Sequence, residues 1–374
     1  MVVPEGDSIY RTATALRAAL LGKPLLSFEA PRHVGLFPNA NAVVERVDSH
    51  GKHLEIGFDD AVILHTHMRM TGSWHLYRTG EQWRKPTSQA RVMLKVPGWQ
   101  AICFNAPVVE IYRAREATRH PGLGSLGPDL CRAGVDIVEC VARIERYCAG
   151  DSTVAEVLLD QRIACGVGNV FKSEVLWACQ VHPLSPIESL SIDQRFRLLE
   201  TVASMLQANV ERVDRVTVPD VPGGTAVYGR TGKPCFRCGS TIEVRKHGQQ
   251  ARVTYFCPGC QVQLGVPIAR QVARRDDEQA RAATVADDPS VADDAEVEPD
   301  ATVVGGPWLG DDRDAADHDA PDVDAGDGDV SGPTLMVGRR IGRRAERIRA
   351  NAATHQARPL RNVDPLLARR AAQR

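Results

Sequence analysis

Four cysteines form two Cys-x2-Cys pairs, and they constrain the fold more than any other feature of this chain. Zinc takes four soft ligands in a tetrahedron, and each such turn supplies two thiolates from a short piece of chain. The 18 residues between the pairs suit a β-hairpin closed by the metal at its base. Two chance pairs or a redox site are the alternatives. The spacing predicts a closed, structural Zn2+ site whose ligands are Cys235, Cys238, Cys257 and Cys260.

The length of 374 residues favours two or three modules rather than one. No run approaches 18 apolar residues, so no transmembrane helix is expected. The first 30 residues show no basic region followed by an apolar core, so no secretory signal is expected either. Ten cysteines without such a signal indicate reduced thiols in the cytoplasm. Those outside the two pairs are interpreted as buried, inert thiols: Cys103, Cys131, Cys140, Cys148, Cys165 and Cys179.

The charge is distributed unevenly along the chain. Residues 276–329 contain 19 acidic and 2 basic residues, a net charge of −17, and residues 338–374 contain 11 arginines and 2 acidic residues, a net charge of +9. The formal net charge of −1 for the whole chain therefore leaves +7 for residues 1–275. A basic folded part favours a polyanionic partner. From about residue 275 onward large apolar residues are few, which predicts disorder.

The first part of the chain has the pattern of a β-sandwich with a flanking helix. Asp7 is interpreted as an N-cap, followed at helical spacing by Ile9, Ala13, Leu16 and Leu20. Short alternating or apolar stretches then follow at 54–58, 61–64, 92–96 and 101–104. Several short strands separated by turn signals favour a sandwich.

The character changes to helices after about residue 128. Residues 154–159 form one apolar helical patch, and Gly166-Val167-Gly168-Asn169 opens a second helix that runs through Trp177. Ser191 with Gln194 is a capping box ahead of a helix to about Val210. Residues 215–234 are rich in Gly, Pro and Thr and are interpreted as a linker.

Five segments together resemble the formamidopyrimidine-DNA glycosylase / endonuclease VIII family of base-excision repair enzymes. They are Pro4-Glu5-Gly6, Gly51-Lys52-His53, His67-Met68-Arg69-Met70-Thr71-Gly72, the run from Gly166 to Glu174, and the run from Tyr228 to Gln261. The resemblance covers roughly residues 3–264. The start Pro-Glu-Gly-Asp is similar to that of the endonuclease VIII branch, which implies oxidised pyrimidines as substrates. Within that branch, the general character of the sequence is similar to that of actinobacterial members.

The resemblance implies a catalytic role for four residues. A terminal Pro4 would attack C1′ of the damaged nucleotide, since a free α-amino group has a pKa near ~7.7–8.0 and is partly neutral at cellular pH. Glu5 would transfer protons. Lys52 and Arg252 would hold the phosphates beside the flipped nucleotide. Without the resemblance, a Pro-Glu-Gly segment ahead of a helix is only a turn.

The resemblance also implies DNA contacts. Met70, with Arg69 or Thr71, would fill the gap left by the everted base, and Asn169 would bind a backbone phosphate. Taken alone, the loop around Met70 is a hairpin turn, and His65 with His67 could be a metal pair. Three departures stand out: Val2-Val3 precede the proline, Ser125 stands where relatives often carry a DNA-contacting arginine, and the tail after about residue 270 has no family counterpart.

The expected fold is multidomain α+β, with four parts. They are a catalytic antiparallel β-sandwich with a flanking helix (3–125), a helix–two-turns–helix DNA-binding domain (126–220), a zinc β-hairpin (226–264) and a disordered tail (271–374). The expected function is a bifunctional DNA glycosylase and apurinic/apyrimidinic lyase that cleaves by β,δ-elimination. The alternatives are a non-catalytic DNA-damage binder and a lyase with weak glycosylase activity.

The expected partner is damaged double-stranded DNA. The protein is expected to be a monomer in the cytoplasm, associated with the nucleoid. We expect it to bind neither a membrane nor an organic cofactor. The acidic part of the tail could occupy the basic cleft and its arginines could hold DNA, or the tail could be inert. An internal proline nitrogen cannot form an iminium, since its lone pair is delocalised into the preceding carbonyl. The family's arrangement therefore requires translation from Val3, or trimming that leaves Pro4 first.

Overall fold

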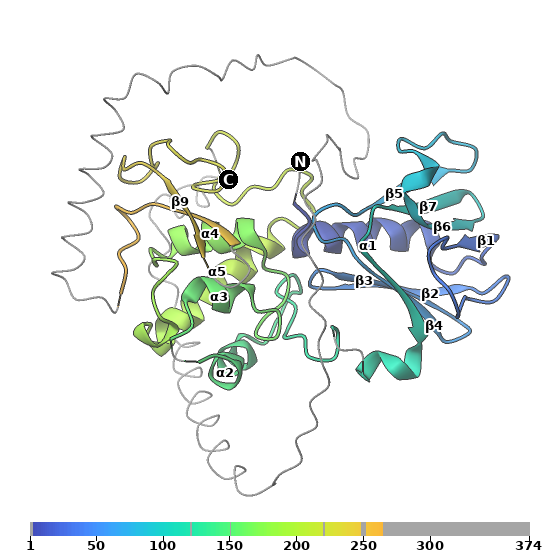
Figure 1. Ribbon diagram of the computed structural model, residues 1–374, viewed down its shortest axis with the longest axis horizontal. Coiled ribbons are helices and arrows are strands. Elements are labelled where there is room, and N and C mark those ends of the chain that lie inside the picture. Colours follow the sequence, from blue (N-terminus) through green and yellow to red (C-terminus); the bar gives the residue numbers. More distant parts are fainter. Residues whose placement is uncertain (1–2, 120–121, 150, 220, 248–251, 265–374) are drawn as a thin grey trace, which may run out of the picture.

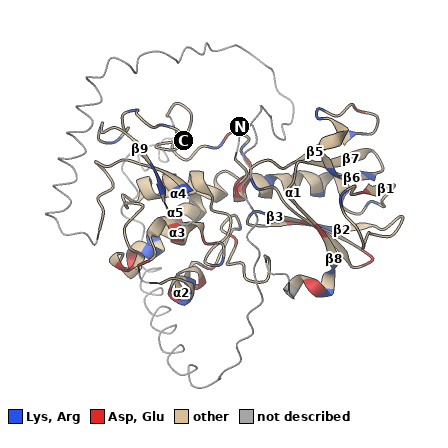
Figure 2. Ribbon diagram, in the orientation of Figure 1, with Lys and Arg blue, Asp and Glu red and all other residues tan. Residues whose placement is uncertain are grey.

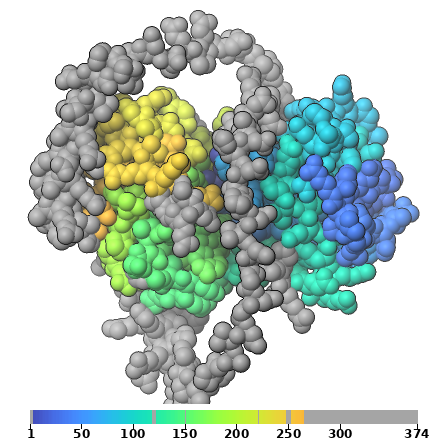
Figure 3. Space-filling view, in the orientation of Figure 1, coloured from blue at the N-terminus to red at the C-terminus, as the bar shows by residue number. Residues whose placement is uncertain are grey.

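The computed structural model describes residues 3–119, 122–149, 151–219, 221–247 and 252–264. Within these ranges the chain forms two lobes that lie side by side, the sandwich in blue and cyan and the helical part in green and yellow (Figures 1 and 3). The predicted tail, residues 271–374, lies outside the described residues. Every helix in the described ranges is too short or too polar to cross a membrane.

The first lobe is a sandwich of two four-stranded antiparallel sheets, with orders β2-β3-β4-β8 and β1-β6-β7-β5. Alternating residues such as Leu54, Ile56, Val92 and Leu94 are buried between them. The predicted β-sandwich is therefore confirmed. The strands are β1 (Ser27–Glu29), β2 (Val44–His50), β3 (His53–Phe58), β4 (Val62–His67), β5 (Ser73–Arg78), β6 (Ala90–Val96), β7 (Trp99–Phe104) and β8 (Val108–Arg113).

Helix α1 (Gly6–Leu20) packs on the sandwich, mainly against β2, and buries the predicted apolar stripe. Fully burying a leucine such as Leu16 or Leu20 contributes about 1.5–3 kcal/mol. The interpretation of Asp7 as the N-cap is wrong: Glu5 is the N-cap, with an extended backbone, and Asp7 lies inside the first turn. Asp7 is buried and paired with a distant arginine, so its carboxylate serves a tertiary contact instead of the helix end.

The second lobe packs its helices around a separate apolar core that includes Phe171, Phe196 and Leu199. Its helices are α2 (Ile137–Tyr147), α3 (Val154–Leu159), α4 (Asn169–Ala178) and α5 (Ile192–Gln207). The predicted capping box of Ser191 and Gln194 is confirmed at the start of α5. That helix ends at Gln207 rather than near Val210, and α2 was not anticipated.

The antiparallel strands β9 (Glu243–His247) and β10 (Arg252–Phe256) form the predicted hairpin. One cysteine pair precedes β9 and the other follows β10, so the base of the hairpin carries all four thiols. Strand β10 packs against α4. This contact fixes the hairpin on the helical lobe.

Candidate active site at the domain junction

The side chain of Glu5 lies in a socket made by the start of α4. It is 1% exposed, and its carboxylate accepts hydrogen bonds from the backbone N–H groups of Gly168 (3.1 Å), Val170 (2.7 Å) and Phe171 (3.3 Å). A helix N-terminus with unpaired N–H groups is a natural place for an anion. Glu5 therefore spans the two lobes, since it belongs to the sandwich and is held by the helical domain.

Gly168 makes this socket possible. A Cβ atom built on Gly168 would lie 2.3 Å from Cδ of Glu5, closer than any real contact. Gly51, in the turn between β2 and β3, likewise faces the loop before α4, where a Cβ would lie 2.8 Å from Sγ of Cys165. The φ of Gly51 is +57°, which also favours glycine. Both glycines allow the two lobes to approach closely beside Glu5.

Burial and nearby charges have opposing effects on Glu5. Burial raises the pKa of this carboxyl, while the cations Arg215 and Lys52 and the hydrogen bond from Val170 act in the lowering direction. The net pKa is raised, so the proton is held at a higher pH than on an ordinary glutamate. A carboxyl that holds its proton more firmly is better suited to act as a proton donor.

Arg215 holds the first residues of the described chain. Its guanidinium makes a bidentate ion pair with Asp7, with Nη2 2.6 Å from Oδ1 and Nε 2.9 Å from Oδ2. Nη2 also donates to the carbonyl of Val3 at 3.2 Å. The side chain of Asp7 is 1% exposed and that of Arg215 is 9% exposed, and a bidentate arginine fixes orientation as well as position. The segment containing Pro4 and Glu5 is thus clamped on either side.

Lys52 lies at the turn between β2 and β3, on the sandwich side of the junction. Burial lowers the pKa of its ammonium, Glu5 raises it, and Arg252 and Arg215 lower it further. These charges are therefore near enough to interact, although their positions in the sequence are far apart. The structure brings the predicted residues Glu5, Lys52 and Arg252 to one junction.

Asn169 and Arg252 lie on the helical side. Asn169 is the first residue of α4, where its neighbour Gly168 contacts Glu5. Arg252 is exposed at the start of β10. Lys and Arg residues are found on both sides of the junction (Figure 2). A polyanion that followed the junction would meet cations from both lobes.

The loop around Met70 leaves the sandwich at the same end of the β3–β4 strand pair as Lys52. His67, the last residue of β4, pairs with His53, the first residue of β3. Met68 is buried in the core, whereas Met70 is 51% exposed. Arg69 has φ +45°, and its N–H donates to Nδ1 of His67 at 3.1 Å. A large apolar side chain is thereby presented to solvent on a hydrogen-bonded turn.

The alternative interpretation of His65 and His67 as a metal pair finds no support. The ring of His65 bonds to His53 (2.9 Å) and to Glu110 (2.7 Å), so both nitrogens are engaged within the sheet. On His67, Nδ1 accepts the backbone N–H of Arg69 at 3.1 Å. Among the described residues, the four cysteines alone form a group with metal-ligand spacing.

The geometry of that group fits a tetrahedral ion. The ligand atoms of Cys235, Cys238, Cys257 and Cys260 all lie within 4.8 Å of one another. Two sulfur pairs are separated by 3.8 Å and 3.4 Å. Four sulfurs about 2.3 Å from one zinc ion would be spaced about 3.8 Å apart. An indole N–H from Trp177 and a backbone N–H donate to Sγ of Cys235, as thiolate ligands require.

The remaining cysteines carry no second site. Four of the six are buried, and Cys148 and Cys179 are half-buried. Burial raises the pKa of all six thiols, which keeps them protonated and weakly nucleophilic.

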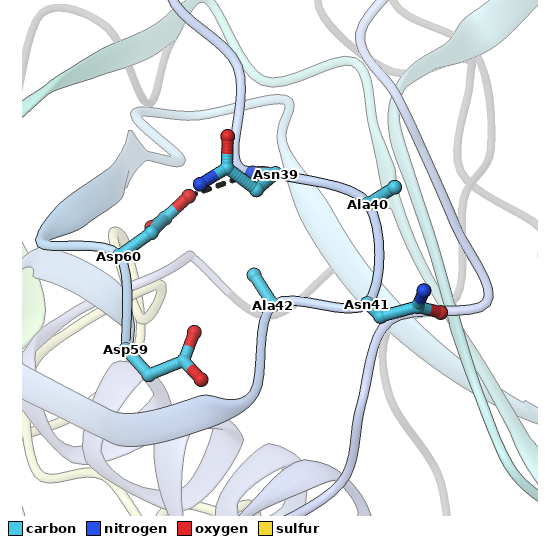
Figure 4. Close-up of a pocket in the computed structure, with 6 residues that line it drawn as sticks. All are labelled: Asn39, Ala40, Asn41, Ala42, Asp59 and Asp60. Atoms are coloured by element: carbon cyan, nitrogen blue, oxygen red, sulfur yellow. Dashed lines mark hydrogen bonds between the residues drawn. The ribbon is translucent and has the colours of Figure 1, made fainter.

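A surface hollow of about 330 Å³ lies on the sandwich lobe (Figure 4). It is lined by residues 39–42 and by Asp59 and Asp60, at the end of the β2–β3 hairpin opposite to Lys52. Strands of this length span about 20 Å. Both carboxylates accept backbone N–H groups, Asp60 from Asn39 and Asp59 from Val43, so they complete the turns.

Sequence reasoning missed three charged residues that build the site: the buried Lys172 and Glu174, and Arg215. Glu174 is fully buried and accepts N–H groups from Ala226, Val227 and Tyr228, which anchors the linker to the hairpin. A charged residue inside an apolar helix is a visible signal for Lys172 and Glu174. Arg215 has no local signal, because its partner is 208 positions away.

Two family patterns match the sequence. The formamidopyrimidine-DNA glycosylase N-terminal domain matches residues 3–107, and the formamidopyrimidine-DNA glycosylase H2TH domain matches residues 126–219.

Curated relatives extend the match over most of their own length. The chain is 34% identical over 264 residues to a probable endonuclease 8 2 of Streptomyces coelicolor, covering 69% of this chain and 94% of that protein. It is 36% identical over 263 residues to the DNA-(apurinic or apyrimidinic site) lyase Nei2 of Mycolicibacterium smegmatis, covering 69% and 99%.

The fold is also similar to that of solved proteins. A Lactococcus lactis Fpg, crystallised with DNA containing N7-benzyl-Fapy-dG, aligns with a TM-score of 0.59 at 22% identity. The alignment covers 70% of this chain and all of that one. At this identity the likeness concerns the fold alone.

Proposed function

The chain belongs to the formamidopyrimidine-DNA glycosylase family, and on that premise we propose that it is a bifunctional DNA glycosylase and apurinic/apyrimidinic lyase of base-excision repair. The observation that carries the proposal is the buried carboxylate of Glu5, next to Pro4 in the chain and held by the N–H groups of Gly168, Val170 and Phe171 at the start of α4. The family membership accounts for the two lobes, and this carboxylate supplies the acid–base group that the chemistry needs.

The reaction would begin with the amine of a terminal Pro4. Its nitrogen attacks C1′ of the damaged nucleotide, the bond from C1′ to the base breaks, and the base leaves with a proton. Glu5 is placed to transfer protons during base departure and opening of the sugar ring. The resulting iminium draws electrons, so that a C2′ proton is removed and the 3′ phosphate leaves. The 5′ phosphate follows, which completes β,δ-elimination.

The DNA would lie along the junction of the two lobes. Lys52 from the sandwich, with Asn169 and Arg252 from the helical side, would contact phosphates around the everted nucleotide. Met70 would occupy the vacated space in the helix, with Arg69 and Thr71 beside it. The exposure of Met70 and the convergence of the charges support this placement.

A substrate preference can also be proposed. Pro4-Glu5-Gly6-Asp7 is similar to the endonuclease VIII branch, and the curated relatives are named endonuclease 8 or lyase. We take oxidised pyrimidines as the preferred lesions. Incision by a protein whose chain begins at Pro4, on duplexes that each carry one oxidised pyrimidine, one 8-oxoguanine or one abasic site, tests this. Equal or faster incision at 8-oxoguanine would overturn the preference, and no incision of any duplex would overturn the function.

The four cysteines would bind Zn2+ as a closed structural site, because four thiolates leave no position for substrate. The ion would hold the two ends of the hairpin together and so support Arg252 on β10.

Metal removal is expected to loosen the hairpin and to abolish DNA binding. Metal analysis should find about one zinc per chain, as one four-ligand site implies. Chelation should lower the melting temperature and the affinity for abasic duplex together. A metal-free protein with unchanged affinity would contradict a structural zinc, and replacement of half-buried Cys148 by Ser is the control for losing a thiol elsewhere.

Arg252→Ala is expected to weaken DNA binding without loss of fold. Arg252 is exposed, so few packing contacts are lost, whereas each phosphate contact releases counterions. The slope of log affinity against log salt should become shallower by about one unit, measured by fluorescence anisotropy. Arg78→Ala, an exposed arginine on β5, is the control. An unchanged slope for Arg252→Ala would exclude the phosphate contact.

A further inference from the structure

Lys172 is a fully buried lysine that joins α4 to the hairpin. Its side chain is 0% exposed. The ammonium nitrogen lies 2.6 Å from Oδ1 of Asn169, 2.7 Å from Oγ1 of Thr254 and 3.0 Å from the carbonyl oxygen of Val253. An ammonium group has three donors, and here each has one oxygen acceptor. A buried lysine is tolerated only when it is satisfied in this way.

The contact with Asn169 determines which way its amide points. Because Oδ1 accepts from the ammonium of Lys172, the NH2 group is the part left to face away from Lys172. A phosphate needs a donor, not an acceptor, so this orientation is the one that suits DNA. On the hairpin side, the acceptors Val253 and Thr254 directly follow Arg252 on β10.

We propose that Lys172 is a positioning residue that aligns the two phosphate contacts on the helical side, Asn169 on α4 and Arg252 on β10. The inference rests on the proposed function, because it assumes that both residues hold DNA. Without Lys172, the amide of Asn169 can turn over, and β10 loses two of its bonds to α4. The hairpin and α4 would then no longer hold Arg252 and Asn169 in a fixed position relative to each other.

The charge on Lys172 provides a second readout. Burial lowers the pKa of its ammonium to about 7, Glu5 raises it, and Arg252 and Lys52 lower it. DNA phosphates would favour the charged form, so binding would take up a proton on the alkaline side of that pKa. The affinity of the natural protein is therefore expected to fall as pH rises above about 7, by up to tenfold per pH unit.

A double-mutant cycle on abasic duplex tests the proposal. Lys172→Met and Asn169→Ala should each raise Kd by roughly tenfold or more, the value of a hydrogen bond to a charged group. The double variant should raise Kd little beyond Lys172→Met alone, because that change already disturbs the contact that Asn169→Ala removes. Lys172→Met should also flatten the pH dependence. Lys246→Met, an exposed lysine on β9, is the control and should retain that dependence.

Thr254→Val extends the test should Lys172→Met fail to fold. This change keeps the shape of the side chain and removes one acceptor of Lys172. It should therefore weaken DNA binding less than Lys172→Met does. Its effect on Kd should also not add to that of Asn169→Ala. Effects that multiply in the cycle would overturn the role of Lys172 while leaving the proposed phosphate contact intact. No effect of Asn169→Ala would overturn both, since the contact itself would be absent.

Discussion

A protein whose chain begins at Pro4 is expected to form a borohydride-stable complex with abasic DNA, and one that retains Val3 is expected to form none above background. With Val3 in place, the nitrogen of Pro4 is a tertiary amide with its lone pair delocalised. It has no proton to lose and cannot become an iminium. Starting translation with Met directly before Pro4 lets removal of the methionine expose the amine. Trapping yield on one abasic duplex measures the difference.

The natural start can be decided by mass spectrometry of the protein from its own host. We propose initiation at Val3, on a valine codon read as methionine, or trimming to Pro4. The carbonyl of Val3 accepts from Arg215, whose bidentate bond to Asp7 would remain once Val3 is gone. A mature chain that begins at Val2 and still traps DNA would falsify Pro4 as nucleophile. A mature chain that begins there and binds lesions without trapping would instead favour the non-catalytic damage binder.

Glu5→Gln is expected to reduce base excision by at least a hundredfold, in the range of roughly 10²–10⁴ for loss of a general acid–base group. The change also places an amide NH2 against backbone donors, because both oxygens of Glu5 accept N–H groups from α4. Stability should fall by about 1–3 kcal/mol, the cost of an unsatisfied buried group. Single-turnover excision and thermal melting separate the two effects.

Gly168→Ala tests the same socket from the opposite lobe. Its Cβ would collide with the side chain of Glu5, so excision should fall although Glu5 is intact. Gly57→Ala is the matched control, because a Cβ there meets Arg46 at an ordinary 3.5 Å. Full excision by a folded Gly168→Ala protein would mean that the seat of Glu5 on α4 is not needed for catalysis.

The pH dependence of the free energy of unfolding tests whether folding raises or lowers the pKa of Glu5. The folded pKa is raised above 4.5, so between that value and the raised pKa the folded state binds more protons than the unfolded state. Stability falls as pH rises through this window. Glu5→Gln does not titrate there, so the variant should lose that slope.

Local rules in the sequence were enough to predict several of the elements and the cysteine group, although not α2, β1, β2, β5 or β8. Alternation of apolar residues marked β3 and β6, and the capping box of Ser191 marked the start of α5. Two cysteine turns predicted the hairpin, because a tetrahedral ion relates residues only a few positions apart in each pair. The resemblance in five short segments indicated the family, since motifs are read along the chain.

The tertiary structure alone decided how the site is assembled. Glu5 meets the N–H groups of residues 168, 170 and 171, and Asp7 meets Arg215, pairs separated by more than 160 positions. The local sequence cannot tell whether Asp7 caps the helix or pairs with a distant arginine, because both roles suit a carboxylate at the start of a helix. Charge satisfaction across the fold decided it: a buried cation and a buried anion each need a partner, and only folding brings those partners together.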